Sequence, residues 1–190
     1  MNYVRIQVDP LLFLCIPAML LLLPLRWFCA VMIAALVHES GHLLCITALG
    51  GCVQEIRFEI PGAVIFAFAP DFLSHCISIA AGPVLSLFLI LWRNTYPELA
   101  LCGLAQGLYN LIPILPLDGG RLMEHFLNRY IPEKTRLLME IIRHICMIPI
   151  LGIIVFTATN QNWYCFPAEV ILLLSLIRKS PCKDAGIKVQ

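Results

Sequence analysis

Apolar positions along the chain are gathered into long runs separated by short polar segments. Six such runs cover residues of about 10–25, 28–48, 73–92, 99–117, 141–159 and 163–177. A helix needs about 20 apolar residues to cross a bilayer core of about 30 Å. The pattern therefore predicts an all-α polytopic membrane protein with about six transmembrane helices, of which 28–48, 73–92 and 99–117 form the core.

The first apolar run also has the outline of a signal peptide, because Arg5 precedes it. No soluble domain follows in this sequence, so we interpret the run 10–25 as a retained membrane helix. The whole chain, residues 1–190, is then expected to be one integral membrane domain, without an inserted PDZ domain or a C-terminal CBS domain.

Two of the intervening segments have a different pattern. Between Val53 and Ala69 apolar and polar residues alternate on both sides of a Pro61-Gly62 turn, which predicts a small β-hairpin at the membrane surface after the second helix. A plain connecting loop is the alternative. The segment 121–143 is amphipathic and broken by Pro132, so it is expected to lie at the interface.

Composition agrees with a membrane protein and excludes other classes. Hydrophobic residues make up 60% of the chain and charged residues 13%, against about 25% charged in soluble domains. A formal net charge of +1 provides no basic surface for nucleic acid. The nine cysteines form no CxxC pair and most lie in apolar runs, so we interpret them as small buried residues.

The placement of positive charge predicts the orientation in the membrane. Lys and Arg accumulate in cytoplasmic loops. If the N-terminus is cytoplasmic, two of the 13 basic residues, Arg26 and Arg93, lie outside and the others lie inside. The expected location is therefore the cell membrane, with a multi-pass topology and both termini in the cytoplasm.

The second apolar run contains the only cluster of residues suited to catalysis at helical spacing. His38-Glu39-Ser40-Gly41-His42 is an HExxH motif. Two histidines four residues apart share one helix face, and a catalytic zinc site combines such ligands with a carboxylate base and an open position. A pair of interior structural histidines is the alternative, but ionisable groups inside a membrane usually serve a site.

A third metal ligand has to come from elsewhere in the chain. The metzincin pattern requires Gly and His where this chain has Cys45 and Ala48. Asp118 is the better candidate, because it follows the fourth apolar run after two helix-breaking prolines. Asp-Gly-Gly after prolines is often an ordinary turn, but the predicted topology brings Asp118 to the same membrane face as the histidines.

These motifs resemble the site-2 protease family of intramembrane zinc metalloproteases. The resemblance rests on the HExxH helix, the Ala81-Gly82-Pro83 segment and the segment from Asn110 through Pro113 to Leu117-Asp118-Gly119-Gly120. The order of elements is most similar to the branch containing stage IV sporulation protein FB. The resemblance implies one Zn²⁺ held by the two motif histidines and Asp118, with Glu39 as the catalytic base.

The expected partner is a membrane protein whose transmembrane segment is locally unwound, since a helical peptide bond is shielded by its neighbours. The hairpin, with Phe58 and Phe66, could offer a strand edge to such a segment. Asn110 is expected either to bind substrate, as the family resemblance implies, or to bond between helices. A regulatory membrane partner is left open.

Two alternatives from other classes are a non-catalytic membrane scaffold that retains the fold and a transporter of metal ions or small solutes. The intact Glu39 argues against the scaffold, because a structural site needs no base. Polar residues that cluster at one face, rather than through the membrane depth, argue against the transporter. Small residues repeat every four positions from Ser74 to Ser86, which we interpret as helix packing.

Overall fold

The computed structural model describes residues 4–59 and 62–159. The predicted helix 163–177 lies outside these residues. The described helices are α1 (Pro10–Leu22), α2 (Leu25–Ala48), α3 (Phe72–Phe88) with a 3₁₀ continuation η1 (Leu89–Trp92), α4 (Pro97–Asn110), α5 (Asp118–Tyr130), the 3₁₀ turn η2 (Pro132–Lys134) and α6 (Thr135–Thr159).

The described helices agree with the predicted apolar runs to within a few residues, except that α4 ends earlier and α6 begins at Thr135 rather than near 141. α4 ends at Asn110 rather than near 117, because Pro113 and Pro116 exclude helix from the loop that follows. The segment 121–143, predicted as an interfacial linker, is mostly helical, since α5 occupies it up to Tyr130 and α6 begins at Thr135.

Two of the described helical segments, Leu25–Ala48 and Phe72–Trp92, are long and apolar enough to span a membrane. α1 has 13 residues and α4 has 14, which correspond to about 20 Å of helix each. This length is short of the bilayer core of about 30 Å. The structure therefore shows a mostly helical protein with two candidate spans, and six crossings stay a prediction.

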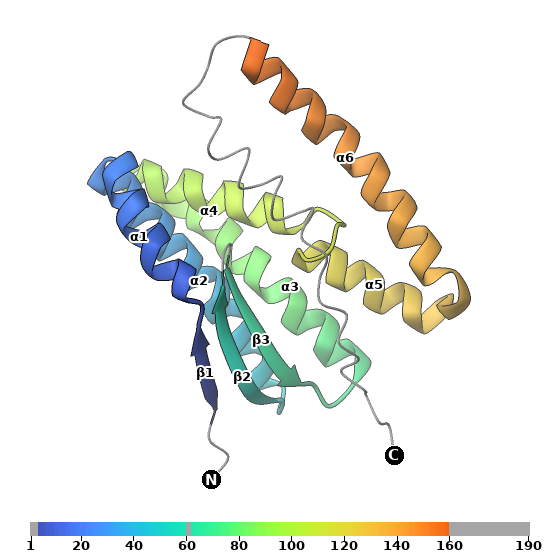
Figure 1. The fold of residues 1–190 in the computed structure, drawn as a ribbon. Coiled ribbons are helices and arrows are strands. Elements are labelled where there is room, and N and C mark those ends of the chain that lie inside the picture. Colours follow the sequence, from blue (N-terminus) through green and yellow to red (C-terminus); the bar gives the residue numbers. More distant parts are fainter. Residues whose placement is uncertain (1–3, 60–61, 160–190) are drawn as a thin grey trace.

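A three-stranded sheet lies alongside α2, as Figure 1 shows. The predicted hairpin is confirmed by the antiparallel strands β2 (Cys52–Glu59) and β3 (Gly62–Phe68). β1 (Arg5–Val8) pairs in parallel with β2, so the strand order is β1-β2-β3. The prediction of an all-α chain with a hairpin missed this third strand, because β1 is short, its four residues are exposed and it is defined only by pairing with a segment far along the chain.

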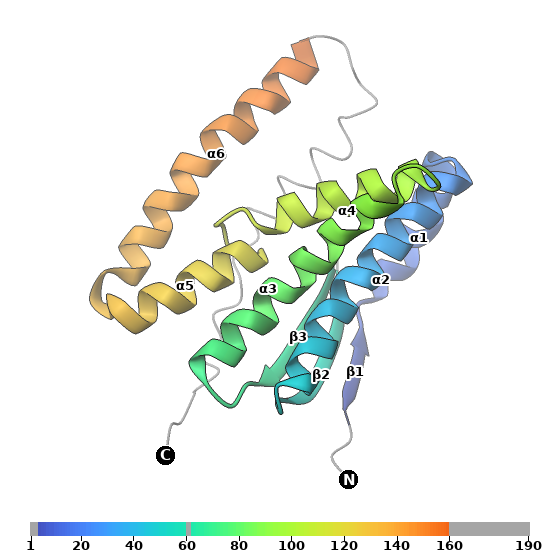
Figure 2. The same ribbon diagram turned by 180° about the vertical axis from the view of Figure 1, so that it is seen from behind.

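The centre of the molecule is a close contact of α2, α3 and α4, which run side by side in both views (Figures 1 and 2). Small side chains permit the approach. A Cβ added to Gly41 on α2 would lie 2.8 Å from the carbonyl oxygen of Ala81 on α3, and one added to Gly103 on α4 would lie 2.7 Å from the Cβ of Leu89. α6 diverges from this group.

A compact loop between α4 and α5 fixes where α5 begins. Ile114 is fully buried and Leu117 is almost so, with Cys146 and Met147 of α6 packed against them. A Cβ at Gly119 or Gly120 would overlap the backbone of this loop, so only glycine allows α5 to start there. The first residue of α5 is Asp118, whose position is thus set by the loop.

Candidate metal centre

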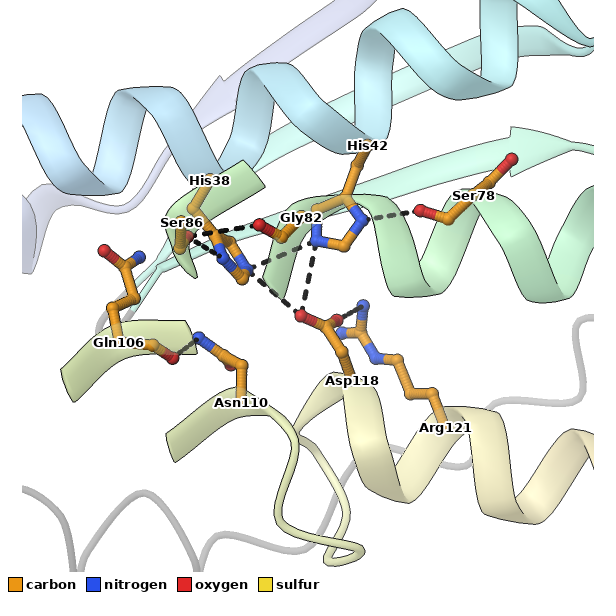
Figure 3. Close-up of polar contacts among 9 residues, drawn as sticks. All are labelled: His38, His42, Ser78, Gly82, Ser86, Gln106, Asn110, Asp118 and Arg121. Atoms are coloured by element: carbon orange, nitrogen blue, oxygen red, sulfur yellow. Dashed lines mark hydrogen bonds and ion pairs between the residues drawn. The ribbon is translucent and has the colours of Figure 1, made fainter. Parts of the chain in front are cut away.

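Two imidazoles from α2 face one point in the interior of the molecule. His38 and His42 lie one turn apart, with ring centroids separated by 4.9 Å. His38 is only 3% exposed. Figure 3 shows both rings turned away from α2 toward α3 and the start of α5, and their Nε2 atoms are 3.2 Å apart. The prediction that His38 and His42 share one face of the helix is confirmed.

The Asp118 carboxylate completes a triangle with these nitrogens. Its Oδ2 atom lies 3.0 Å from Nε2 of His38 and 3.3 Å from Nε2 of His42. A tetrahedral zinc ion with bonds of about 2.0–2.2 Å separates its ligand atoms by about 3.3 Å. The three side chains form the metal-binding group found among the described residues, and its dimensions fit such an ion.

The outer nitrogens of the two rings determine which tautomer each imidazole adopts. Nδ1 of His42 lies 2.8 Å from the carbonyl oxygen of Ser78, which can only accept a hydrogen bond. Nδ1 of His38 lies 2.9 Å from Oγ of Ser86, whose own proton is donated to the carbonyl oxygen of Gly82. The hydrogen-bond network thus places a proton on both Nδ1 atoms and a lone pair on each neutral Nε2.

Nε2 of His38, Nε2 of His42 and Oδ2 of Asp118 therefore point lone pairs at one another, with no hydrogen atom between them as long as both imidazoles are neutral. Such an arrangement is repulsive unless a positive charge, either a proton or a metal ion, lies among them. When that charge is a proton on an imidazole, burial raises the pKa of Asp118, but hydrogen bonds and charge from the two rings lower it by more, so the pKa lies below its ordinary value.

Glu39 is a half-buried residue of α2 that directly follows His38 in the chain. The predicted base is thus the sequence neighbour of one member of the metal-binding group. Arg121 of α5 lies on the other side of Asp118, with a nitrogen 3.9 Å from Oδ1. Sequence reasoning did not identify Arg121 or Ser86 as neighbours of the site.

The predicted substrate-binding residues lie on two other elements. Asn110 is the last residue of α4, and its amide nitrogen donates to the carbonyl oxygen of Gln106 at 3.1 Å. Phe58 lies in the central strand β2, opposite Val8 on one side and Ala63 on the other. Phe66 lies in β3, 38% exposed, with the Arg57 guanidinium 4.9 Å from its ring centroid.

The remaining histidines in the described part of the chain lie away from the triangle. The rings of His75 and His125 pack against each other with centroids 4.3 Å apart, and His125 stacks on Phe72. His144 is exposed on α6.

Comparisons with known proteins point to the same class. The model of peptidase family M50 matches residues 56–151, about half of the chain. A zinc metalloprotease of Methanocaldococcus jannaschii is 26% identical over 117 residues, which include 54% of this chain and 34% of the relative. The chain thus spans about a third of the length of that curated relative.

The fold is also similar to a solved structure. The site-2 protease from Methanocaldococcus jannaschii superimposes with a TM-score of 0.65 at 19% identity, covering 93% of this chain and 91% of that one. A mostly helical fold with two candidate membrane spans and a His-His-Asp group that fits a metal ion defines the class of protein, which is a membrane metallopeptidase. The chain belongs to peptidase family M50. The similarity to the sporulation branch stays a prediction.

The metal-binding group predicts how single substitutions change metal content. We expect the wild-type protein to bind about one zinc ion per chain. His42→Ala and Asp118→Asn each remove a ligand and should lose the ion, whereas His144→Ala should keep it because that side chain is exposed on α6. Metal analysis of the purified proteins in detergent tests this. An Asp118→Asn protein that retains a full equivalent of zinc would exclude Asp118 as a ligand.

Proposed function

We propose that the protein is a zinc-dependent intramembrane endopeptidase that hydrolyses peptide bonds of transmembrane or membrane-associated substrates near the cytoplasmic face. The observation that supports this most directly is the triangle formed by His38, His42 and Asp118, with Glu39 next to His38 in the same motif. Membership of a peptidase family supports hydrolysis, and the similarity to a zinc metalloprotease supports zinc as the metal.

The chemistry divides between the ion and the side chains. A zinc ion in this position supplies a Lewis acid that makes water a stronger nucleophile and polarises a peptide carbonyl. Glu39 takes a proton from the attacking water and then delivers it to the nitrogen of the departing amine, so the carboxylate is regenerated at the end of the cycle. His38, His42 and Asp118 hold the ion and exchange no proton.

A substrate helix has to unwind before its peptide bond can react, because its backbone groups are already paired. The unwound segment then needs new partners for its N–H and C=O groups in an apolar environment. β3 can provide them, since it pairs with β2 on one side only among the described strands. The central position of β2 leaves the backbone of Phe58 no free edge, so Phe58 can contribute only through its side chain.

We further propose a multi-pass topology with both termini in the cytoplasm. The parallel pairing of β1 with β2 supports it, because it holds Arg5 and Arg57 on the same side. A helix that leaves this side, as α1 does, and one that returns, as α2 does, agree with that pairing. Assembly with a regulatory membrane protein belongs to the same proposal and would be sought by crosslinking in native membranes.

Glu39→Gln separates chemistry from metal binding. The variant keeps all three ligands, so it should bind zinc as the wild type does, while the loss of the base should lower kcat by about 10²–10⁴-fold. The measurement compares single-pass membrane proteins in cells that express either form and identifies those that lose their cytoplasmic portions. His144→Ala serves as the active control. Undiminished cleavage by Glu39→Gln would leave the proposed base without a role.

Ile65→Pro tests the strand edge. The Phe58 carbonyl accepts from Asp9 on the β1 side, so Ile56 also faces β1, and Ile65 opposite it directs its N–H to the open edge of β3. Proline removes this N–H, so it should raise KM for a transmembrane substrate without displacing zinc. Ile65→Ala keeps the N–H and is the matched control for the side chain alone. If the proline variant has the same KM as the alanine variant, main-chain pairing at this position plays no part in binding.

Cysteine labelling tests the topology. In a protein whose nine native cysteines have been replaced, Lys134→Cys and Arg93→Cys create single exposed thiols at opposite ends of the helices. A membrane-impermeant reagent added to intact cells should label position 93 and should reach position 134 only after the membrane is opened. Labelling of both positions in intact cells contradicts the proposed orientation.

A further inference from the structure

A stripe of small residues on α3 faces the two imidazoles of α2. Ser74, Ser78, Gly82 and Ser86 repeat every four residues, and all four are buried. The repeat alone is typical of close helix packing. In the structure, however, three of the four residues contact a histidine of the metal centre, so packing does not account for the whole pattern.

The first two contacts hold His42. The carbonyl oxygen of Ser78 accepts the Nδ1–H of His42 at 2.8 Å. A Cβ at Gly82 would overlap the same imidazole ring, so the ring occupies the space that glycine leaves open. Together they fix both the direction and the depth of His42.

The third contact holds His38 and is made by a side chain. Oγ of Ser86 is 2.9 Å from Nδ1 of His38 and 3.1 Å from the carbonyl oxygen of Gly82. Because the carbonyl can only accept, the Ser86 hydroxyl donates to it and accepts from His38. Only the tautomer of His38 with a proton on Nδ1 completes this chain of hydrogen bonds. Ser86 is fully buried, so water cannot replace its hydroxyl easily.

We propose that the Ser78–Gly82–Ser86 stripe is a positioning surface that sets the tautomer and orientation of both imidazoles, and that the Ser86 hydroxyl is the group through which it acts on His38. The stripe touches neither the ion nor the reacting atoms. Hydrogen bonds to the outer nitrogen of a ligating histidine raise its basicity and fix its ring. The proposal rests on the zinc site of the proposed function and adds to it the residues that make the site selective for one geometry.

The two serines of the stripe act through different atoms, which provides a matched control. Ser78 reaches His42 through its main-chain carbonyl, while its hydroxyl donates to the carbonyl oxygen of Ser74 at 2.7 Å. Ser78→Ala therefore keeps the contact with His42. Ser86→Ala loses the contact with His38. Both changes replace a buried serine by alanine on the same face of the same helix, so their packing consequences are alike.

The experiment measures zinc affinity of the full-length protein in detergent by competition with a chelator. We expect Ser86→Ala to weaken zinc binding by about 10–100-fold, as is typical when an outer partner of a metal ligand is removed. Ser78→Ala should stay close to the wild type. Thermal unfolding of the metal-free proteins should be similar for the two variants, which separates positioning from general stability.

Cobalt provides a readout that a purely structural role would not change. The visible absorption of bound Co²⁺ depends on coordination geometry, so it should change in Ser86→Ala and not in Ser78→Ala. Equal zinc affinities and equal cobalt spectra for the two variants overturn the positioning role. A wild-type protein that binds no zinc overturns the proposed function as well, whereas wild-type binding with an unaffected Ser86→Ala variant overturns only the role of the stripe.

Discussion

The structure depends on one constraint, which is that three lone-pair atoms are held within hydrogen-bonding distance of each other inside a membrane protein. Nε2 of His38, Nε2 of His42 and Oδ2 of Asp118 lie 3.0–3.3 Å apart. The two Nε2 atoms carry no proton, because the hydrogen bonds to Ser86 and Ser78 keep the proton of each ring on Nδ1. The cluster can persist only around a positive charge, and the scaffold has to supply rigidity on every side because the atoms repel each other without that charge.

Three separate elements provide this rigidity. α2 carries both histidines, α3 accepts hydrogen bonds from their Nδ1–H groups, and the buried loop around Ile114 sets the start of α5 at Asp118. The carboxylate also lies at the N-terminus of α5, where the unpaired N–H groups of a helix favour negative charge. None of these elements could be removed without releasing at least one side of the triangle, which is why glycines without room for a Cβ are found at each contact.

Sequence reasoning succeeded where the spacing of residues close together in the chain determines the chemistry. The HExxH motif placed His38 and His42 on one face, and charge placement brought Asp118 to the same end of the bundle. It failed where a long-range contact decides. β1 is a short exposed segment that becomes a strand only beside β2. The stripe on α3 was interpreted as packing alone, because spacing cannot distinguish a serine that permits close approach from one whose hydroxyl or carbonyl serves a histidine.

The connectivity explains how a strand edge could act on a centre built from helices. β2 begins shortly after α2 ends at Ala48, and β3 ends at Phe68 shortly before α3 begins. The hairpin is thus tied at both ends to the two helices that hold and orient the imidazoles, and β1 fixes its far edge. An extended segment that pairs with β3 would therefore be positioned by these two helices. Binding of an unwound substrate and alignment of its peptide bond with Glu39 would then follow from the same pair of elements, with no separate domain required.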